Sequence, residues 1–186
     1  MAYKPRLKEK YEQEVRPGLM ETFSYKNVHQ APMPTKVCIS MGVSEAGTNM
    51  DTLEKAMKEV SRIIGQQPCI TRAKRSVANF DVRQGNAVGM RATLRHDRMW
   101  EFLDRLFSIA IPRIRDFRGL PREAMDGRGS YSLGITDLLI FPELNYDDVE
   151  KTRGLHITIT TSAHTDEEGR ELLERLGLPL KRVEQL

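Results

Sequence analysis

Four segments of the chain carry apolar residues at helical spacing, and each is predicted to form an amphipathic helix. The first begins near Arg6, and Pro17 breaks or restarts it. The second is capped by Asp51 or a neighbour and ends at Gly65, a residue suited to the left-handed position after a helix. Its buried stripe is predicted to consist of Leu53, Ala56, Met57, Val60, Ile63 and Ile64.

The two remaining helices have clearer ends. The third is predicted over residues 97–110, with Asp97 as its cap and Pro112 just beyond it. The fourth starts at Thr165, which forms the reciprocal capping box with Glu168, and stops before Pro179. The third helix is expected to turn inward with Met99, Phe102, Leu103, Leu106, Ile109 and Ala110.

Alternating or short apolar runs predict five strands, over residues 36–41, 69–71, 88–94, 138–141 and 156–161. The order of elements is not a strict alternation of strands and helices. It indicates an α+β fold, with a mostly antiparallel sheet, helices packed on one face and long basic loops projecting, in a single domain over residues 1–186. The other face is expected to be open and polar, with Arg91, Thr93, His156, Thr158 and Thr160.

Two basic stretches do not fit this core. Residues 71–87 connect two predicted strands and are several times longer than an ordinary hairpin loop, so the connection is expected to be either disordered or functional. Residues 112–134 mix arginines with glycines, and we expect a flexible backbone there that follows the contour of a partner.

Positive charge is concentrated in the middle of the chain. The whole protein has a net charge of +3, but residues 72–128 contain thirteen basic residues, most of them arginine, and seven acidic ones, so this window carries +6 and the remainder −3. Arginine presents a planar fork that matches phosphate oxygens. This distribution is typical of a nucleic-acid footprint, although solvated faces and internal ion pairs would produce it too.

Other classes of protein receive less support. No apolar run is long enough to span a membrane, and no secretion signal or transit peptide is evident, which indicates a soluble intracellular protein. The two cysteines are isolated, so no metal site, disulfide or cofactor is predicted. The alternatives left open are a small-molecule enzyme using His156 and Asp126, and a regulatory protein that binds mRNA or DNA.

Several motifs resemble the bacterial large ribosomal subunit protein five family over nearly the whole chain, from about Leu7 to Pro179. The resemblance rests on the order and spacing of short segments: GQQP at 65–68, TRAKRS at 71–76, RMWEFLDRL at 98–106, PRIRDFRG at 112–119, DGRG at 126–129, FPE at 141–143, RG at 153–154 and TDEE at 165–168.

The resemblance implies a non-catalytic structural protein of the large ribosomal subunit, located on the ribosome in the cytoplasm and acting in translation. It implies binding to 5S rRNA in the central protuberance, together with contacts to 23S rRNA, to P-site tRNA, to a small-subunit head protein across the intersubunit bridge, and to other 5S rRNA-associated ribosomal proteins. The same resemblance implies an antiparallel sheet with helices on one side.

The family's motifs also imply site residues. Contact with 5S rRNA falls on Ser40, Gln66 and Thr93, and Arg91 lies on the same polar face. Ser40 departs from the asparagine usual in the family, and a hydroxyl offers fewer hydrogen bonds than an amide. The loop expected to contact tRNA carries Lys74, Arg75, Ser76, Asn79 and Phe80, and further rRNA or intersubunit contacts are expected at Arg113, Arg115, Arg118 and Arg128.

Overall fold

The computed structural model describes residues 3–43, 50–145 and 151–181 of the 186-residue chain. The chain divides into two compact units. One contains residues 1–37, 94–133 and 158–186, and the other contains residues 38–93 and 134–157. We refer to them as the first and the second unit.

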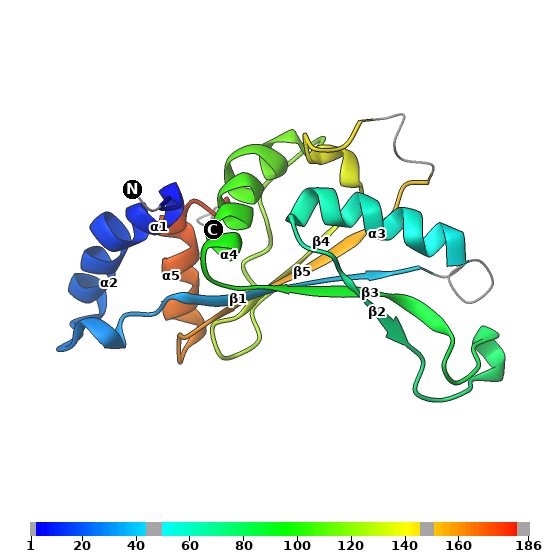
Figure 1. Cartoon of the computed structure of the whole chain (residues 1–186). Coiled ribbons are helices and arrows are strands. Elements are labelled where there is room, and N and C mark those ends of the chain that lie inside the picture. Colours follow the sequence, from blue (N-terminus) through cyan, green and yellow to red (C-terminus); the bar gives the residue numbers. More distant parts are fainter. Residues whose placement is uncertain (1–2, 44–49, 146–150, 182–186) are drawn as a thin grey trace. The chain divides into compact units, whose positions relative to one another are not determined.

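The described residues form a five-stranded antiparallel sheet with the strand order β2-β3-β1-β5-β4 (Figure 1). Helices pack against it, which confirms the predicted α+β fold. In chain order the strands are β1 (Pro34–Gly42), β2 (Cys69–Arg72), β3 (Ala87–Leu94), β4 (Tyr131–Ile135) and β5 (Leu155–Thr161).

One predicted strand is wrong and one real strand was missed. Residues 138–141 were predicted as a strand, but Leu138–Ile140 forms a 3-10 turn. The side chain of Asp137 accepts the backbone N–H of Leu139 at 2.9 Å, and this local bond competes with strand pairing. The missed strand is β4, a run of only five residues in which Tyr131, Leu133 and Ile135 are buried and alternate with Ser132 and Gly134.

The second unit contains α3 (Met50–Ile64), which lies along the strands in Figure 1. Its predicted stripe is buried except for Met57, which is half-buried, and Gly65 adopts the predicted left-handed conformation. Asp51 lies in the first turn of the helix, and residue 49, the position that would cap it, is outside the described residues.

The first unit begins with helical segments from Arg6 to Phe23. These are α1 (Arg6–Lys10), a π-helical turn (Tyr11–Val15) and α2 (Arg16–Phe23). Val15 and Arg16 keep helical dihedrals, so the helical backbone continues through Pro17, with the π-helical turn directly before it, instead of breaking there.

The third predicted helix is α4 (His96–Arg105), followed by a π-helical turn (Leu106–Ala110) and a 3-10 turn (Ile111–Arg113). Two details of its prediction are wrong. Arg95, not Asp97, is the capping position, and Asp97 instead pairs with Lys8 at 3.2 Å. Ile109 is 41% exposed, because the wider π-helical turn rotates it away from the buried stripe.

The last helix, α5 (Asp166–Leu176), has the predicted capping box. Thr165 Oγ1 accepts the N–H of Glu168, and a Glu168 carboxylate oxygen accepts the N–H of Thr165, each at 3.4 Å. Tyr25 donates its hydroxyl to the other oxygen of Glu168 at 2.5 Å, so the same carboxylate also fixes the end of the N-terminal segment. Burial and this bond together raise the pKa of Tyr25.

Candidate nucleic-acid interface

In the second unit the sheet has one buried and one exposed face. Along β1 and β3, the apolar residues Ile39, Met41, Met90 and Ala92 are buried. Ser40, Arg91 and Thr93 alternate with them and are exposed. We call the surface formed by Ser40, Arg91 and Thr93 the open face. The predicted polar face is therefore present in this unit, and it brings together three of the four residues expected to contact 5S rRNA.

The open face continues onto the edge strand β2. The fourth expected residue, Gln66, lies shortly before β2 in the sequence. Cys69 pairs with Arg91 across the antiparallel β2–β3 ladder, so both side chains are on the same face. Gln66 is half-buried in the connection 65–68 that leads from α3 into β2. This connection places an amide side chain at the start of the edge strand.

The chemistry of the open face suits RNA. Hydroxyl groups on Ser40 and Thr93 donate and accept hydrogen bonds, and the Arg91 guanidinium supplies several donors and a positive charge. Within the described part of the chain, Arg91 forms no ion pair. Its charge is therefore available to a polyanion instead of being neutralised internally.

The long connection between β2 and β3 is an ordered hairpin extension, which we call the finger (residues 73–86). Its two arms are joined by hydrogen bonds from Ala73 N to Asn86 O at 2.8 Å and from Gly85 N to Ala73 O at 3.0 Å. Nearer the tip, Val77 and Val82 form an antiparallel bridge. The finger is therefore ordered, and of the two alternatives expected for this long connection, the disordered loop is wrong.

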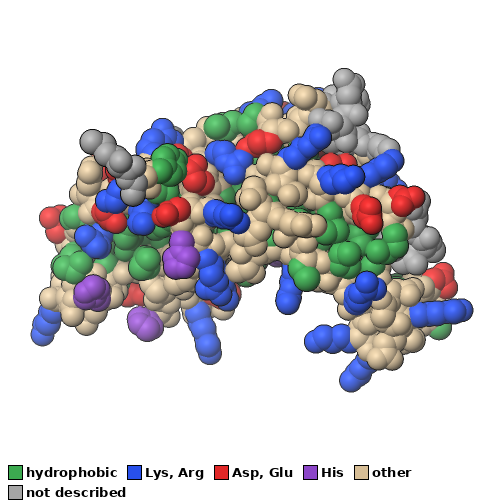
Figure 2. All heavy atoms as spheres, in the orientation of Figure 1, with side chains coloured by type: hydrophobic (Ala, Val, Ile, Leu, Met, Phe, Trp, Pro, Cys, Tyr) green, Lys and Arg blue, Asp and Glu red, His purple; other side chains and the backbone are tan. Residues whose placement is uncertain are grey.

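Side chains add further constraints to the finger. The Ser76 hydroxyl accepts the N–H of Gln84 at 2.9 Å, and Arg72 donates to the carbonyl of Gly85 at 2.9 Å. Figure 2 shows Lys and Arg side chains projecting around this hairpin. All five residues expected to contact tRNA are exposed on it: Lys74, Arg75, Ser76, Asn79 and Phe80.

The Arg- and Gly-rich segment 112–134 lies in the first unit except for its last residue, and from Leu120 to Tyr131 it is held by contacts with other parts of that unit instead of being flexible. Near one end, Leu120 pairs with Leu180, with a bond from Lys181 N to Leu120 O of 2.9 Å. Tyr131 donates its hydroxyl to the carbonyl of Pro121 at 2.7 Å, and burial raises its pKa to about 12. Glycine in this segment therefore permits close packing.

Two carboxylates hold the turn 126–129, which we call the arginine turn. Asp126 Oδ1 accepts the N–H groups of Arg128 and Ser130, each at 2.9 Å. Asp166, the first residue of α5, accepts the N–H of Gly129 at 2.8 Å and that of Gly127 at 3.2 Å. The backbone donors of the turn are thus satisfied internally, and the Arg128 side chain remains exposed.

The anchors place exposed arginines near opposite ends of α5. Arg118 precedes the contact with Lys181 beyond the end of the helix, whereas Arg128 lies in the turn fixed by Asp166 at its start. Eleven helical residues span about 16 Å. Arg113 and Arg115 are also exposed, and none of these four arginines forms an ion pair with another described residue.

Arg122 behaves differently from its neighbours. It donates to Glu174 at 2.5 Å and to the carbonyl of Lys181 at 2.7 Å. It therefore attaches the segment to α5 and is not free for a partner. Local sequence patterns reveal neither this anchor nor the role of Asp166, because both join residues more than 35 positions apart.

Hydrogen bonding makes the arginine turn sensitive to acid. The backbone N–H groups of Ser130 and Arg128 lower the pKa of Asp126 below its usual value. Its stabilising effect is complete above the unfolded-state pKa of about 3.9 and is lost as the pH falls through the lower folded-state pKa. We expect urea midpoints of the wild type to fall more steeply below about pH 4 than those of Asp126→Asn. Parallel curves for the two proteins would contradict this role.

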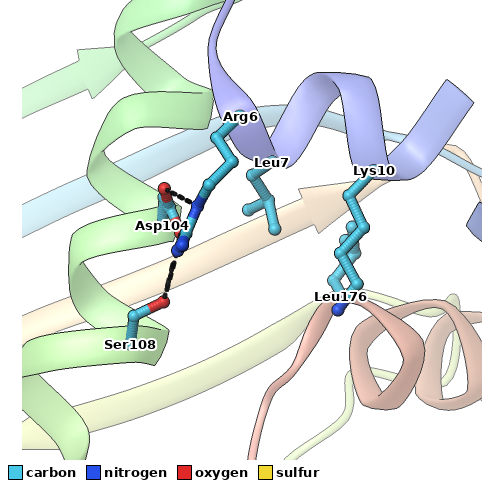
Figure 3. Close-up of a pocket in the computed structure, with 6 residues that line it drawn as sticks. All are labelled: Arg6, Leu7, Lys10, Asp104, Ser108 and Leu176. Atoms are coloured by element: carbon cyan, nitrogen blue, oxygen red, sulfur yellow. Dashed lines mark hydrogen bonds and ion pairs between the residues drawn. The ribbon is translucent and has the colours of Figure 1, made fainter.

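A surface cavity in the first unit offers no catalytic arrangement. It has a volume of about 230 Å³ and is lined by Arg6, Lys10, Asp104 and Ser108 among others (Figure 3). Arg6 donates to Asp104 at 2.6 Å and to Ser108 at 3.1 Å, so the carboxylate is already paired with a cation. Such a carboxylate is a poor base for activating the serine.

His156 and Asp126, the residues of the alternative enzyme hypothesis, are not arranged as a catalytic pair either. Asp126 is occupied by two backbone donors, and His156 is exposed on β5. Among the described residues, no three metal-binding side chains cluster. No helix in the described ranges meets the length and hydropathy of a membrane span.

Comparison with known proteins identifies the family. The family described as "Ribosomal protein L5" matches residues 27–83, and the "ribosomal L5P family C-terminus" matches residues 87–180. The chain is 56% identical over 174 residues to "Large ribosomal subunit protein uL5" of Streptococcus thermophilus, covering 94% of this chain and 97% of the relative. The proteins of that name from Thermoanaerobacter sp. and Clostridium perfringens are 55% and 56% identical, with the same coverage. The chain therefore belongs to the bacterial ribosomal protein L5 family, whose members are structural proteins of the large ribosomal subunit in translation and are not enzymes.

Proposed function

We propose that this protein binds 5S rRNA through the open face and Gln66, and that residues 1–186 act as one RNA-binding domain in the central protuberance. The observation that carries the proposal is the row of exposed Ser40, Arg91 and Thr93 on a sheet whose alternate residues are buried. Hydroxyl, amide and guanidinium groups at fixed positions can bond 2′-hydroxyls and phosphates, which is how proteins recognise the shape of RNA.

Ser40 is expected to contribute less to this contact than Gln66 and Thr93. Its hydroxyl is exposed, but it is shorter than the amide that the family resemblance predicts at this position. Arg91, on the neighbouring strand, supplies charge-assisted hydrogen bonds.

We further propose that the finger contacts P-site tRNA. Such a contact must accept every tRNA sequence, and backbone-directed cations and hydroxyls meet that requirement. Lys74, Arg75, Ser76 and Asn79 are exposed on a hairpin whose backbone is already ordered, so little backbone entropy is lost when they bind.

The exposed arginines of the first unit suit the remaining partners. We propose that Arg113, Arg115, Arg118 and Arg128 contact 23S rRNA, the small-subunit head protein across the intersubunit bridge, or other 5S rRNA-associated ribosomal proteins. The support is the exposure of all four arginines and, near Arg118 and Arg128, the attachment of the backbone to the two ends of α5.

The test of 5S rRNA binding is the double variant Gln66→Ala with Thr93→Ala. Two lost hydrogen bonds should weaken 5S rRNA binding by about tenfold or more. No charge is removed, so the slope of log K against log salt should stay the same. Filter binding across salt concentrations, with an unrelated RNA of equal length as competitor, measures both quantities.

A matched control is Gln13→Ala with Thr136→Ala, which removes exposed residues of the same two types outside the open face. Thermal unfolding should show both double variants folded. Wild-type affinity in the Gln66 and Thr93 variant would refute the assignment of the open face, whereas equal losses in both would show a nonspecific effect.

A further inference from the structure

The tip of the finger is apolar, although the finger as a whole is basic. Phe80 is 78% exposed and Val77 is 42% exposed. Apolar side chains with this much exposed surface are unfavourable in water, and they cluster where a partner covers them. Cations and hydroxyls account for the rest of the finger but do not explain Phe80.

The backbone of the tip holds Phe80 outward. Residues Ala78–Phe80 form a 3-10 turn, and Asp81 follows in the left-handed conformation at φ 51°. Val77 O accepts the N–H groups of both Phe80 and Val82, each at 3.3 Å, and the Val77–Val82 bridge closes the turn. The ring therefore projects from an ordered element and is not the exposed end of a loose loop.

Cations share the finger with this ring. Lys74, Arg75 and Arg83 are exposed on the same finger, and Asp81 is its single acidic residue. None of the three cations forms an ion pair with another described residue. An exposed aromatic ring and unpaired cations on one element are the combination with which proteins bind nucleic acid by stacking on bases and by charge.

Resting on the proposed function of the finger, we propose that Phe80 stacks on an exposed base or base-pair face of the RNA that the finger contacts. Every base has a π-face, so stacking adds affinity without selecting a sequence, as a site for all tRNAs requires. Lys74, Arg75 and Arg83 would hold the flanking phosphates. The finger then binds RNA in two ways, by charge and by an apolar contact. Salt screens the charge interaction but not the apolar contact.

The variant Phe80→Trp tests the proposal in the full-length protein. Trp100, the one native tryptophan, is 3% exposed and provides an internal reference that RNA does not reach. Titration with bulk tRNA should quench the emission of the new tryptophan by at least half and leave wild-type emission unchanged. Heparin, a polyanion without bases, should not quench it.

Affinity measurements separate stacking from simple apolar contact. Phe80→Leu keeps an apolar side chain but removes the ring, and it should weaken tRNA binding by about fivefold or more, whereas Phe80→Trp should retain it. Tyr3→Leu is the matched control, because Tyr3 is another aromatic residue with 72% exposure and lies in the other unit. It should leave tRNA affinity unchanged.

The outcomes distinguish this inference from the proposed function. If Lys74→Ala with Arg75→Ala weakens tRNA binding but the new tryptophan is not quenched, stacking is refuted and the finger remains a tRNA contact. Unchanged affinity in every finger variant would refute both. Equal quenching by heparin, or a blue shift on anionic lipid vesicles without any response to tRNA, would also overturn the stacking role.

Discussion

Glu59→Ala should lower the free energy of unfolding by about 3–5 kcal/mol, because it leaves a buried guanidinium without its carboxylate. Glu59 lies on α3, and Arg153 lies just before β5 in the same unit. The two side chains are 6% and 9% exposed, and Glu59 Oε2 lies 3.6 Å from Arg153 Nη1. Water therefore cannot replace the lost partner. Urea denaturation measures the change.

Two comparisons isolate the effect of the buried charge. Glu54→Ala removes an exposed glutamate from the same helix and should change stability by less than about 0.5 kcal/mol. Glu59→Met with Arg153→Met removes both charges together and should recover most of the loss, because an apolar pair of similar volume needs no solvation. If Glu59→Ala cost no more than Glu54→Ala, the ion pair would contribute nothing to stability.

This ion pair illustrates what local patterns do not reveal. The apolar stripe of α3 and the capping box of α5 repeat within a few residues, so the sequence predicts both. Glu59 lies outside the predicted apolar stripe, and its partner Arg153 is 94 residues away in the sequence. The sequence pattern therefore gives no sign that Glu59 is buried. The alternating residues of β3 were predicted for the same local reason, since a strand with one exposed face repeats every two residues.

The candidate site divides in the same way. Arginine content and the exposure of Arg91 follow from composition and strand alternation. Whether an arginine is paired internally cannot be predicted in this way. Arg122 and Arg128 are close in sequence, but Arg122 is bound to Glu174, whereas the side chain of Arg128 projects from the arginine turn. The order of the finger likewise depends on pairing between its two arms, for which its sequence carries no strong hairpin signal.

Gly129→Ala should destabilise the protein by about 2–4 kcal/mol, because it combines backbone strain with overpacking. Gly129 has φ +78°, and a Cβ atom there would lie 2.5 Å from the Cβ of Ala163 and 2.9 Å from the carbonyl oxygen of Thr165. Gly169 contributes to the same tight packing, since a Cβ at that position would lie 2.5 Å from Gly129 O. The arginine turn and the start of α5 thus meet backbone to backbone.

Gly127→Ala separates the two causes within the same turn. Gly127 has φ +81°, but no atom lies within 4 Å of its Cβ position, so this variant should lose only about 1–2 kcal/mol from strain. Denaturant midpoints of the two variants, measured side by side, give the contribution of close packing as their difference. Equal losses of stability in the two variants would mean that the residues around Gly129 move to accept a methyl group at little cost. In that case Arg128 would be held by the carboxylates of Asp126 and Asp166 alone, without support from the packing of Gly129.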